Sequence, residues 1–230
     1  MIRSAVSRAR VPSGVARALF VGLPLLALAA CGGEAEGDAP PPVRHAEVAD
    51  LRAAAAYRLI GTDDAIAALE ADVAALDSAA QSTARPALDD VLAKRARLQT
   101  RLDSLDAGQF ADAEAFGATE AEVSDTIDGL HRAITRSRVL LADDGRELVG
   151  RASTVLSRAE SRAARLRADS TAEGLRAGAE LDTMRVAVER SLGDLRRRGA
   201  RFDSLREVVA LSVAELSVAM GDTLPPGLRR

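Results

Sequence analysis

Apolar residues recur every three or four positions along most of the chain between His45 and Met220. One series, at intervals of 3-4-3-4 residues, consists of Ile66, Leu69, Val73, Leu76 and Ala80. This spacing places side chains on one face of an α-helix and is the heptad pattern of helices that pack side by side. No stretch in this span alternates between apolar and polar residues as a half-buried strand does. The pattern therefore predicts an all-α protein.

Three further series have the same spacing. The second, which includes the polar Arg95, consists of Leu88, Val91, Arg95, Leu98, Leu102 and Leu105. The third consists of Val123, Ile127, Leu130, Ile134 and Leu141. The fourth and longest runs from Val188 to Met220. Together the series predict an elongated helical bundle or an antiparallel coiled coil of about four long helices.

Residues that favour helix ends lie between the series. Pro86 predicts the start of the second helix, because proline fits the first helical turn. The acidic pairs Asp63-Asp64 and Asp89-Asp90 also suit helix starts, where carboxylates accept bonds from free N–H groups. Ala107-Gly108 suits the end of the second helix.

The capping-box spacing, Ser or Thr followed three residues later by Glu, occurs at Thr119–Glu122 and at Ser170–Glu173. These pairs predict the starts of the third and fourth helices. Gly145 follows Asp143-Asp144 and either breaks the third helix or only softens it. The fourth helix, if it is continuous from Thr171 to Met220, is about 75 Å long at 1.5 Å per residue.

Composition and charge refine this architecture. Aromatic residues make up 2% of the chain and tryptophan is absent, which favours thin seams between helices over a deep core. Residues 32–130 contain 8 basic and 20 acidic residues, whereas residues 131–230 contain 19 and 14. Opposite net charges favour packing of one half on the other, within one chain or between two. Chance drift is the alternative, because exposed charge pairs contribute little individually.

The first thirty residues have the organisation of a signal peptide. Four arginines and no acid precede residue 18, and residues 18–30 are uncharged. As a helix these 13 residues rise about 20 Å, which is too short for a hydrocarbon core of about 30 Å. A cleaved signal is therefore favoured over a permanent membrane-spanning helix.

The apolar run ends in Leu28-Ala29-Ala30-Cys31, which resembles the lipobox of bacterial lipoprotein precursors. The resemblance implies cleavage before Cys31 and acyl chains, palmitate among them, on this cysteine. Several chains give stable attachment to a membrane. The residue after the cysteine is Gly32 and not the aspartate that retains some lipoproteins in the inner membrane, so the periplasmic face of the outer membrane is favoured. The alternative is an ordinary cleaved signal with an incidental cysteine.

These features divide the chain into four parts. Residues 1–30 are the expected signal peptide, and residues 31–43, rich in Gly, Pro and acids, are a lipidated tether. Residues 44–221 form the helical domain, and residues 222–230 are a C-terminal tail. Cys31 is the only cysteine, so no disulfide can form within the chain.

Residues for catalysis are scarce. The two histidines, His45 and His131, have no second histidine or carboxylate at the spacing of a helical zinc site, and such a site needs three or more ligands. The acidic pairs suit helix ends better than metal binding, because adjacent residues on a helix point in different directions. No nucleophile motif and no glycine-rich phosphate loop is present. The sequence therefore predicts neither an enzyme nor a metal or cofactor.

One basic cluster is a candidate site for an anionic partner. It consists of Arg196, Arg197, Arg198 and Arg201. Lipid head groups, lipopolysaccharide phosphates and cell-wall carboxylates have the required charge, although Asp194 and Asp203 dilute the cluster and favour a solvated helix face. Nucleic acid is not expected, because the chain is acidic overall and lacks aromatic residues for base stacking.

Two functions fit these observations. The first is a non-enzymatic scaffold, spacer or adaptor in the cell envelope, with a protein partner or a second copy of the chain. The second is a helical module that binds a lipid or a small molecule in a groove between helices. An apolar cavity in the folded body would favour the second function.

Overall fold

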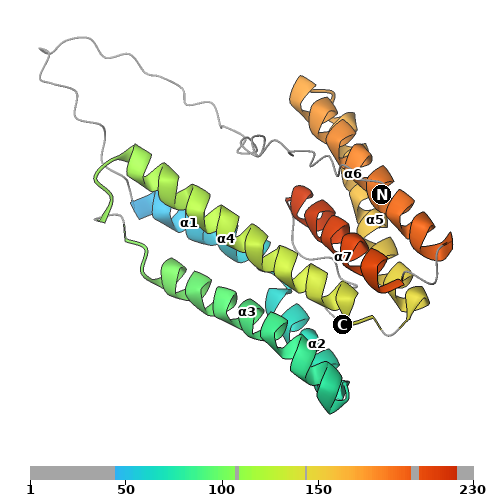
Figure 1. The fold of residues 1–230 in the computed structure, drawn as a ribbon. Helices are drawn as coiled ribbons and strands as arrows, with labels where there is room; N and C mark the ends of the chain where they lie inside the picture. The colour runs from blue at the N-terminus through green and yellow to red at the C-terminus, as the bar shows by residue number, and fades with distance from the viewer. Residues whose placement is uncertain (1–44, 107–108, 143, 198–201, 222–230) are drawn as a thin grey trace, which may run out of the picture. The chain divides into compact units, whose positions relative to one another are not determined.

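The computed structural model describes residues 45–106, 109–142, 144–197 and 202–221 (Figure 1). Within these ranges the regular secondary structure is helical and no strand is present, which confirms the all-α prediction. The expected signal peptide, Cys31, the tether, Arg198, Arg201 and the tail from residue 222 lie outside the described residues.

The helices follow one another with short connections. Their bounds are α1 His45–Arg58, α2 Thr62–Ala75, α3 Ser78–Asp103, α4 Ala113–Leu140, α5 Gly145–Ala168, α6 Ala172–Arg197 and α7 Phe202–Ala219. The four helices from α3 to α6 are the longest, at 24 to 28 residues each.

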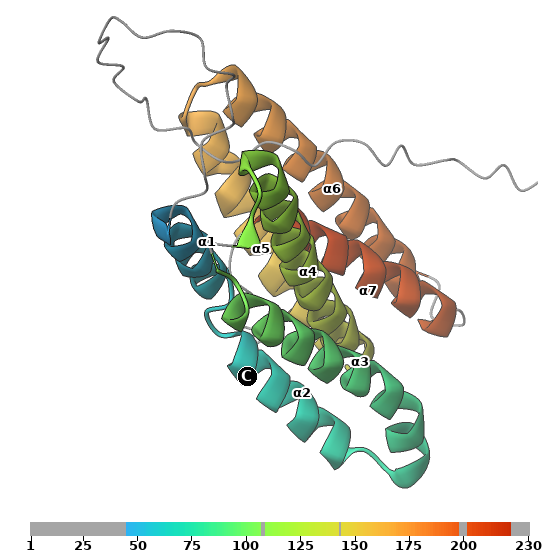
Figure 2. The ribbon, with the colours of Figure 1, turned by 90° about the vertical axis from the view of Figure 1, so that its left-hand side faces the viewer.

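Helix α4 joins two groups of helices. On one side it packs against α3, which packs against α2, and on another side it packs against α7. Helix α6 packs against both α5 and α7. The two ribbon views agree on the α2–α3 and α6–α7 neighbours (Figures 1 and 2).

Two separate hydrophobic cores lie along α4. The N-terminal region, residues 45–134, has a core that includes Leu69, Val91 and Leu130. The C-terminal region, residues 139–220, has a core that includes Val155 and Leu216. The apolar seams predicted from the sequence supply most of these buried residues. The boundary between the acidic and basic halves, at residues 130 and 131, falls inside α4, so the two halves are not separate units.

Polar side chains cap the N-termini of the four long helices. Asp77, Asp112 and Asp144 each accept a hydrogen bond from a backbone N–H two or three residues later, at α3, α4 and α5. The hydroxyl of Thr171 accepts from Gly174 N at 2.9 Å at the start of α6. These bonds satisfy N–H groups that have no partner within the helix.

Two predicted helix starts are wrong. Pro86 lies inside α3, because this helix already begins nine residues earlier with Asp77 as its cap. Pro86 is exposed to solvent there. Asp89 and Asp90 also lie inside α3, where Asp90 pairs with Lys94 one turn later. Asp63 and Asp64 do lie in the first turn of α2, as predicted.

The two capping-box sequences also do not begin helices where predicted. Thr119 lies within α4 and donates to Ala115 O, because Asp112 caps that helix seven residues earlier. The cap of α6 is Thr171 and not Ser170, whose positive φ of 53° places it in the preceding turn.

Gly145 marks a true break. Helix α4 ends at Leu140 and α5 begins at Gly145, with Asp144 as its cap. The stretch from Thr171 to Met220 is not one continuous helix but contains two helices, α6 and α7, that pack against each other. Both stretches carry an apolar face, and folding back allows each face to be buried.

Candidate functional site

An apolar groove lies where α2 and α3 meet the end of α4. Its volume is about 590 Å³, within the range of small-molecule sites. From α2 and the α2–α3 connection its walls are formed by Leu69, Val73 and Leu76. From α3 they are formed by Ala80, Thr83, Ala84, Ala87 and Leu88. The opposite wall consists of Ser137, Leu140, Leu141, Ala142 and Arg206.

The groove is a seam that the helices leave open. The first ten residues of α3 include no buried residue, and Leu88 is the first buried residue of this helix. Three alanines, Ala80, Ala84 and Ala87, face Leu140 and Leu141 across the groove. Alanine side chains bury little area, and the half-buried Ala80, Ala84, Leu140 and Leu141 keep apolar surface accessible along the groove.

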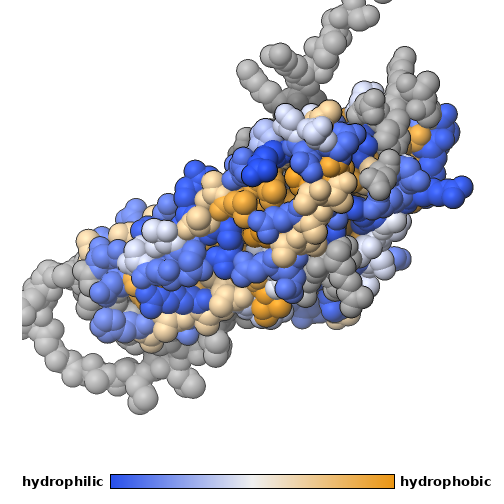
Figure 3. Space-filling view, turned by 90° about the horizontal axis from the view of Figure 1, so that it is seen from below, coloured by the Kyte–Doolittle hydropathy of each residue, from blue (hydrophilic) through white to orange (hydrophobic). Residues whose placement is uncertain are grey.

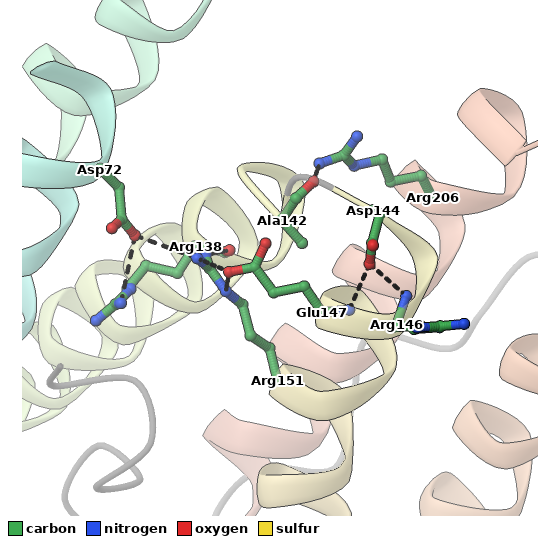
Figure 4. A network of polar contacts seen from close by, with 8 residues as sticks. All are labelled: Asp72, Arg138, Ala142, Asp144, Arg146, Glu147, Arg151 and Arg206. Carbon is green, nitrogen blue, oxygen red and sulfur yellow. Dashed lines mark hydrogen bonds and ion pairs between the residues drawn. The ribbon is translucent and has the colours of Figure 1, made fainter. Parts of the chain in front are cut away.

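A network of charged residues lies beside the groove (Figure 4). Arg138 is 2% exposed and its Nη2 lies 3.3 Å from Asp72 Oδ2. Arg151 Nη2 lies 3.5 Å from the same carboxylate oxygen and 2.6 Å from Glu147 Oε1. Asp72 belongs to α2, Arg138 to α4, and Arg151 and Glu147 to α5, so this network joins three helices.

Burial governs the electrostatics of this network. Desolvation lowers the pKa of Arg138 from its ordinary value, and Asp72 opposes the shift. Arg151 donates to the carbonyl of Arg138 near the end of α4, where carbonyls have no helical partner. At the start of α5, backbone bonds from Glu147 and Arg146 lower the pKa of Asp144. The network thus fixes the α4–α5 bend against α2.

Arg206 closes the groove from α7. Its Nη2 donates to the carbonyl of Ala142, just after the end of α4. Arg206 is the one charged residue among the described residues that line the groove. The bond to Ala142 fixes this cation at the rim of an otherwise apolar and neutral surface.

A second buried polar contact lies in the N-terminal region. His131 of α4 is 3% exposed, and its Nε2 lies 3.3 Å from Thr62 Oγ1 at the start of α2. Burial, with a contribution from the charge of Arg58, lowers the pKa of His131 to about 4. His131 is therefore neutral near pH 7 and buried in the seam between α2 and α4.

Of the predicted site residues, the structure describes Arg196 and Arg197, and neither lines this groove. Arg196 and Arg197 lie exposed at the end of α6, where Arg197 Nη2 pairs with Asp194 Oδ1 at 2.7 Å. Cys31, Arg198 and Arg201 lie outside the described ranges.

The sequence patterns did not predict the roles of Arg138 in the network and of Arg206 at the groove. The signal for Arg138 is a gap in the third apolar series, because the seam positions between Ile134 and Leu141 are occupied by Ser137 and Arg138. A polar residue at a seam position indicates that its side chain contacts a polar partner, as Arg138 contacts Asp72. Arg206 offers no comparable signal, since its role depends on how α7 folds back onto α4.

Two other kinds of site are absent from the described ranges. No group of three or more metal-binding side chains comes together there. Within the same ranges, no helix combines the length and apolarity needed to cross a bilayer. The groove and its adjoining network are therefore the main candidate site.

Comparison with known proteins gives no match. No protein-family model, no curated protein and no solved structure is similar to this chain. A function is therefore inferred from the groove, the network and the lipobox-like sequence at residues 28–31.

Proposed function

We propose that this chain is a non-enzymatic lipoprotein of the cell envelope whose helical body binds an apolar molecule in the groove between α2, α3 and the end of α4. The observation that carries this proposal is the open apolar seam of about 590 Å³. A ligand that covers the half-buried Leu76, Ala84 and Leu140 would remove apolar surface from water, which is worth about 25 cal/mol per Å². A pure spacer would gain stability by closing such a seam.

The anchor in this proposal is Cys31, with acyl chains that hold the body at the periplasmic face of the outer membrane. No metal, cofactor or nucleic acid takes part. The support is the lipobox-like Leu28-Ala29-Ala30-Cys31 at the end of an uncharged run. Replacement of Cys31 by serine should release the protein from membranes or leave an uncut precursor, measured by detergent phase partitioning. Equal partitioning of the two forms would contradict the anchor.

The finer architecture we propose is an elongated bundle built from antiparallel coiled-coil pairs of the four long helices. Ion pairs next to the connections support it. Arg101 of α3 pairs with Glu122 of α4 at 3.1 Å, and Arg167 of α5 pairs with Asp182 of α6. Both pairs link the end of one helix to the start of the next, as antiparallel neighbours require.

Binding in the groove can be tested with Nile red, a neutral dye whose fluorescence rises in apolar surroundings. The full chain with Cys31→Ser should enhance the fluorescence, and Ala84→Trp, which fills the groove, should reduce that enhancement at least fivefold. Ala187→Trp is the matched control, because Ala187 is exposed on α6 and does not line the groove. Equal enhancement in all three proteins would contradict the proposed function.

A second candidate function is a scaffold or adaptor that binds another envelope protein or a second copy of the chain. The observation that favours it is an exposed apolar pair one turn apart on α7, Val208 and Leu211, at 49% and 47% exposure. Figure 3 shows orange, apolar areas among hydrophilic residues on one face of the molecule. The exposed Arg196 and Arg197 would suit an anionic partner. Pull-down from solubilised membranes with wild type and Val208→Asp tests this function.

A further inference from the structure

We infer that a second copy of this chain covers the outer face of α7, so that two chains pair through an antiparallel contact between their α7 helices. The outer face of α7 consists of Ser204, Val208, Leu211, Glu215 and Val218. None of these residues lines the groove, so the pairing goes beyond the proposed function and does not depend on it.

Helix α7 has two faces with heptad spacing. The inner face consists of Val209, Val213, Leu216 and Met220, all of which are buried in the C-terminal core. The outer face has intervals of 4-3-4-3 residues, which is the pattern of a helix that packs against another helix. A helix at the surface of a bundle needs only one such face, because its opposite side meets water. The outer face therefore matches a further helix.

The apolar side chains of the outer face reach solvent. Val208 is 49% exposed and Leu211, one turn later, is 47% exposed. Val218 is half-buried two turns beyond Leu211. Apolar side chains that gather on one exposed face are typical of a protein–protein contact.

The charges next to this face are paired within the chain. Glu215 is the one charged residue of the stretch 208–219, and its Oε1 lies 2.8 Å from Arg132 Nε of α4. Glu207, at the edge of the face, pairs with Arg136 of α4. A strongly charged partner would therefore meet no complementary charge on this face. An identical face meets it without strong repulsion between like charges.

Pairing of two identical faces also gives a register. A two-fold contact uses the same surface on both chains. In an antiparallel pair, Val208 of one copy lies opposite Leu211 of the other, and the same register places Glu215 opposite the small, uncharged Ser204. A parallel pair would place Glu215 opposite Glu215. The antiparallel direction is therefore favoured.

Sedimentation velocity of the full chain carrying Cys31→Ser tests the pairing, because this variant keeps acyl chains out of the measurement. The chain should form a dimer. Leu211→Asp should weaken the dimer at least tenfold, because it places a carboxylate in the contact. Val186→Asp is the matched control, since Val186 is similarly exposed, at 43%, but lies on α6. Residues 1–44 are the same in all variants, so association through them would not distinguish the variants.

Two variants at Ser204 test the direction of the pair. Ser204→Arg faces Glu215 of the second copy in the antiparallel pair and should tighten the dimer at least threefold. Ser204→Glu should weaken it at least tenfold for the same reason. In a parallel pair residue 204 faces residue 204, so both variants would weaken the dimer and overturn the antiparallel arrangement.

A monomer at every concentration tested would overturn the inference. Equal dimerisation of wild type and Leu211→Asp would also overturn it, as would equal weakening by Leu211→Asp and Val186→Asp. A monomer that binds phosphatidylcholine vesicles, with binding lost in Leu211→Asp, would assign the outer face to a membrane and overturn the pairing. The proposed function is judged separately, because Leu211→Asp should leave the enhancement of Nile red fluorescence unchanged.

Discussion

The two regions on either side of α4 use the same helical pattern but close their seams differently. In the C-terminal region, α5 presents Ala152, Ala159 and Ala163 as fully buried residues, and α6 presents glycines at Gly174 and Gly178. A Cβ built on Gly174 would lie 2.6 Å from Leu166 O, and one on Gly178 would lie 3.1 Å from Ala163 O. Small residues here face small residues, and the two helices approach closely.

In the N-terminal region, three alanines of α3 and Leu140 of α4 line a groove that stays open. At a neighbouring seam position α4 carries Arg138, which pairs with Asp72 of α2, in place of an apolar side chain. The comparison shows that a heptad pattern predicts which faces meet. The residues opposite one another decide whether the seam closes.

The largest expected difference between the regions comes from a buried charge. Leu192→Asp on α6 should destabilise the protein by about 4 kcal/mol, because it places an unpaired carboxylate in the closed core. Leu76→Asp at the open groove should cost about 1 kcal/mol or less, since water reaches this half-buried position. Urea unfolding measures both values. Similar losses would mean that the groove is not open to water.

Acid should weaken the N-terminal region first. The pKa of His131 is about 4 in the folded chain and about 6.5 when unfolded, so the unfolded state binds more protons between these values. The stabilisation is complete above pH 6.5 and is lost as the pH falls toward 4, to a total of about 3 kcal/mol at most. Urea unfolding at several pH values should show this loss in wild type and a smaller one in His131→Gln.

Hydrogen exchange locates the effect. Amides of α1 and α2 should exchange faster at pH 5 than at pH 7 after correction for intrinsic rates, whereas amides of α5 and α6 should change less. Equal acceleration in both regions would contradict the assignment of the effect to His131.

Removal of the carboxylate that joins the regions should have an intermediate effect. Asp72→Ala leaves Arg138 buried without this ion-pair partner and should destabilise the protein by about 2 kcal/mol. The double variant Asp72→Ala, Arg138→Met should recover most of the loss, because no buried charge then remains at that position. Thermal unfolding of the three proteins measures this coupling. A double variant less stable than Asp72→Ala would contradict the explanation.

The smallest effects compare two glycines. Gly174→Ala should destabilise by about 1–2 kcal/mol, because the added methyl group meets the α5 backbone. Gly150→Ala in α5 should stabilise by about 0.5–1 kcal/mol, because nothing lies within 4 Å of the added carbon and alanine favours helix. Opposite signs in the melting temperature would support close packing of α5 on α6. Equal signs would contradict it.

The sequence predicted the helical class and most of the buried faces, since apolar spacing alone determines both. Several predicted helix starts are wrong. Asp77 caps α3 before Pro86, and Asp112 caps α4 before Thr119. The groove could be foreseen only as a possibility. Its walls come from the predicted seam, including Leu69, Val73 and Leu76, but whether a seam closes depends on tertiary contacts such as Asp72 with Arg138.

The central claim is that the open seam of the N-terminal region is a ligand site. Native mass spectrometry of the full chain with Cys31→Ser, purified without detergent from the periplasm, tests it most directly. We expect a fraction of the protein to carry one noncovalent adduct with the mass of an apolar small molecule, and we expect Ala84→Trp to lack this adduct while Ala187→Trp retains it. An adduct equally abundant in Ala84→Trp, or no adduct in any form even after incubation with Nile red, would contradict the claim.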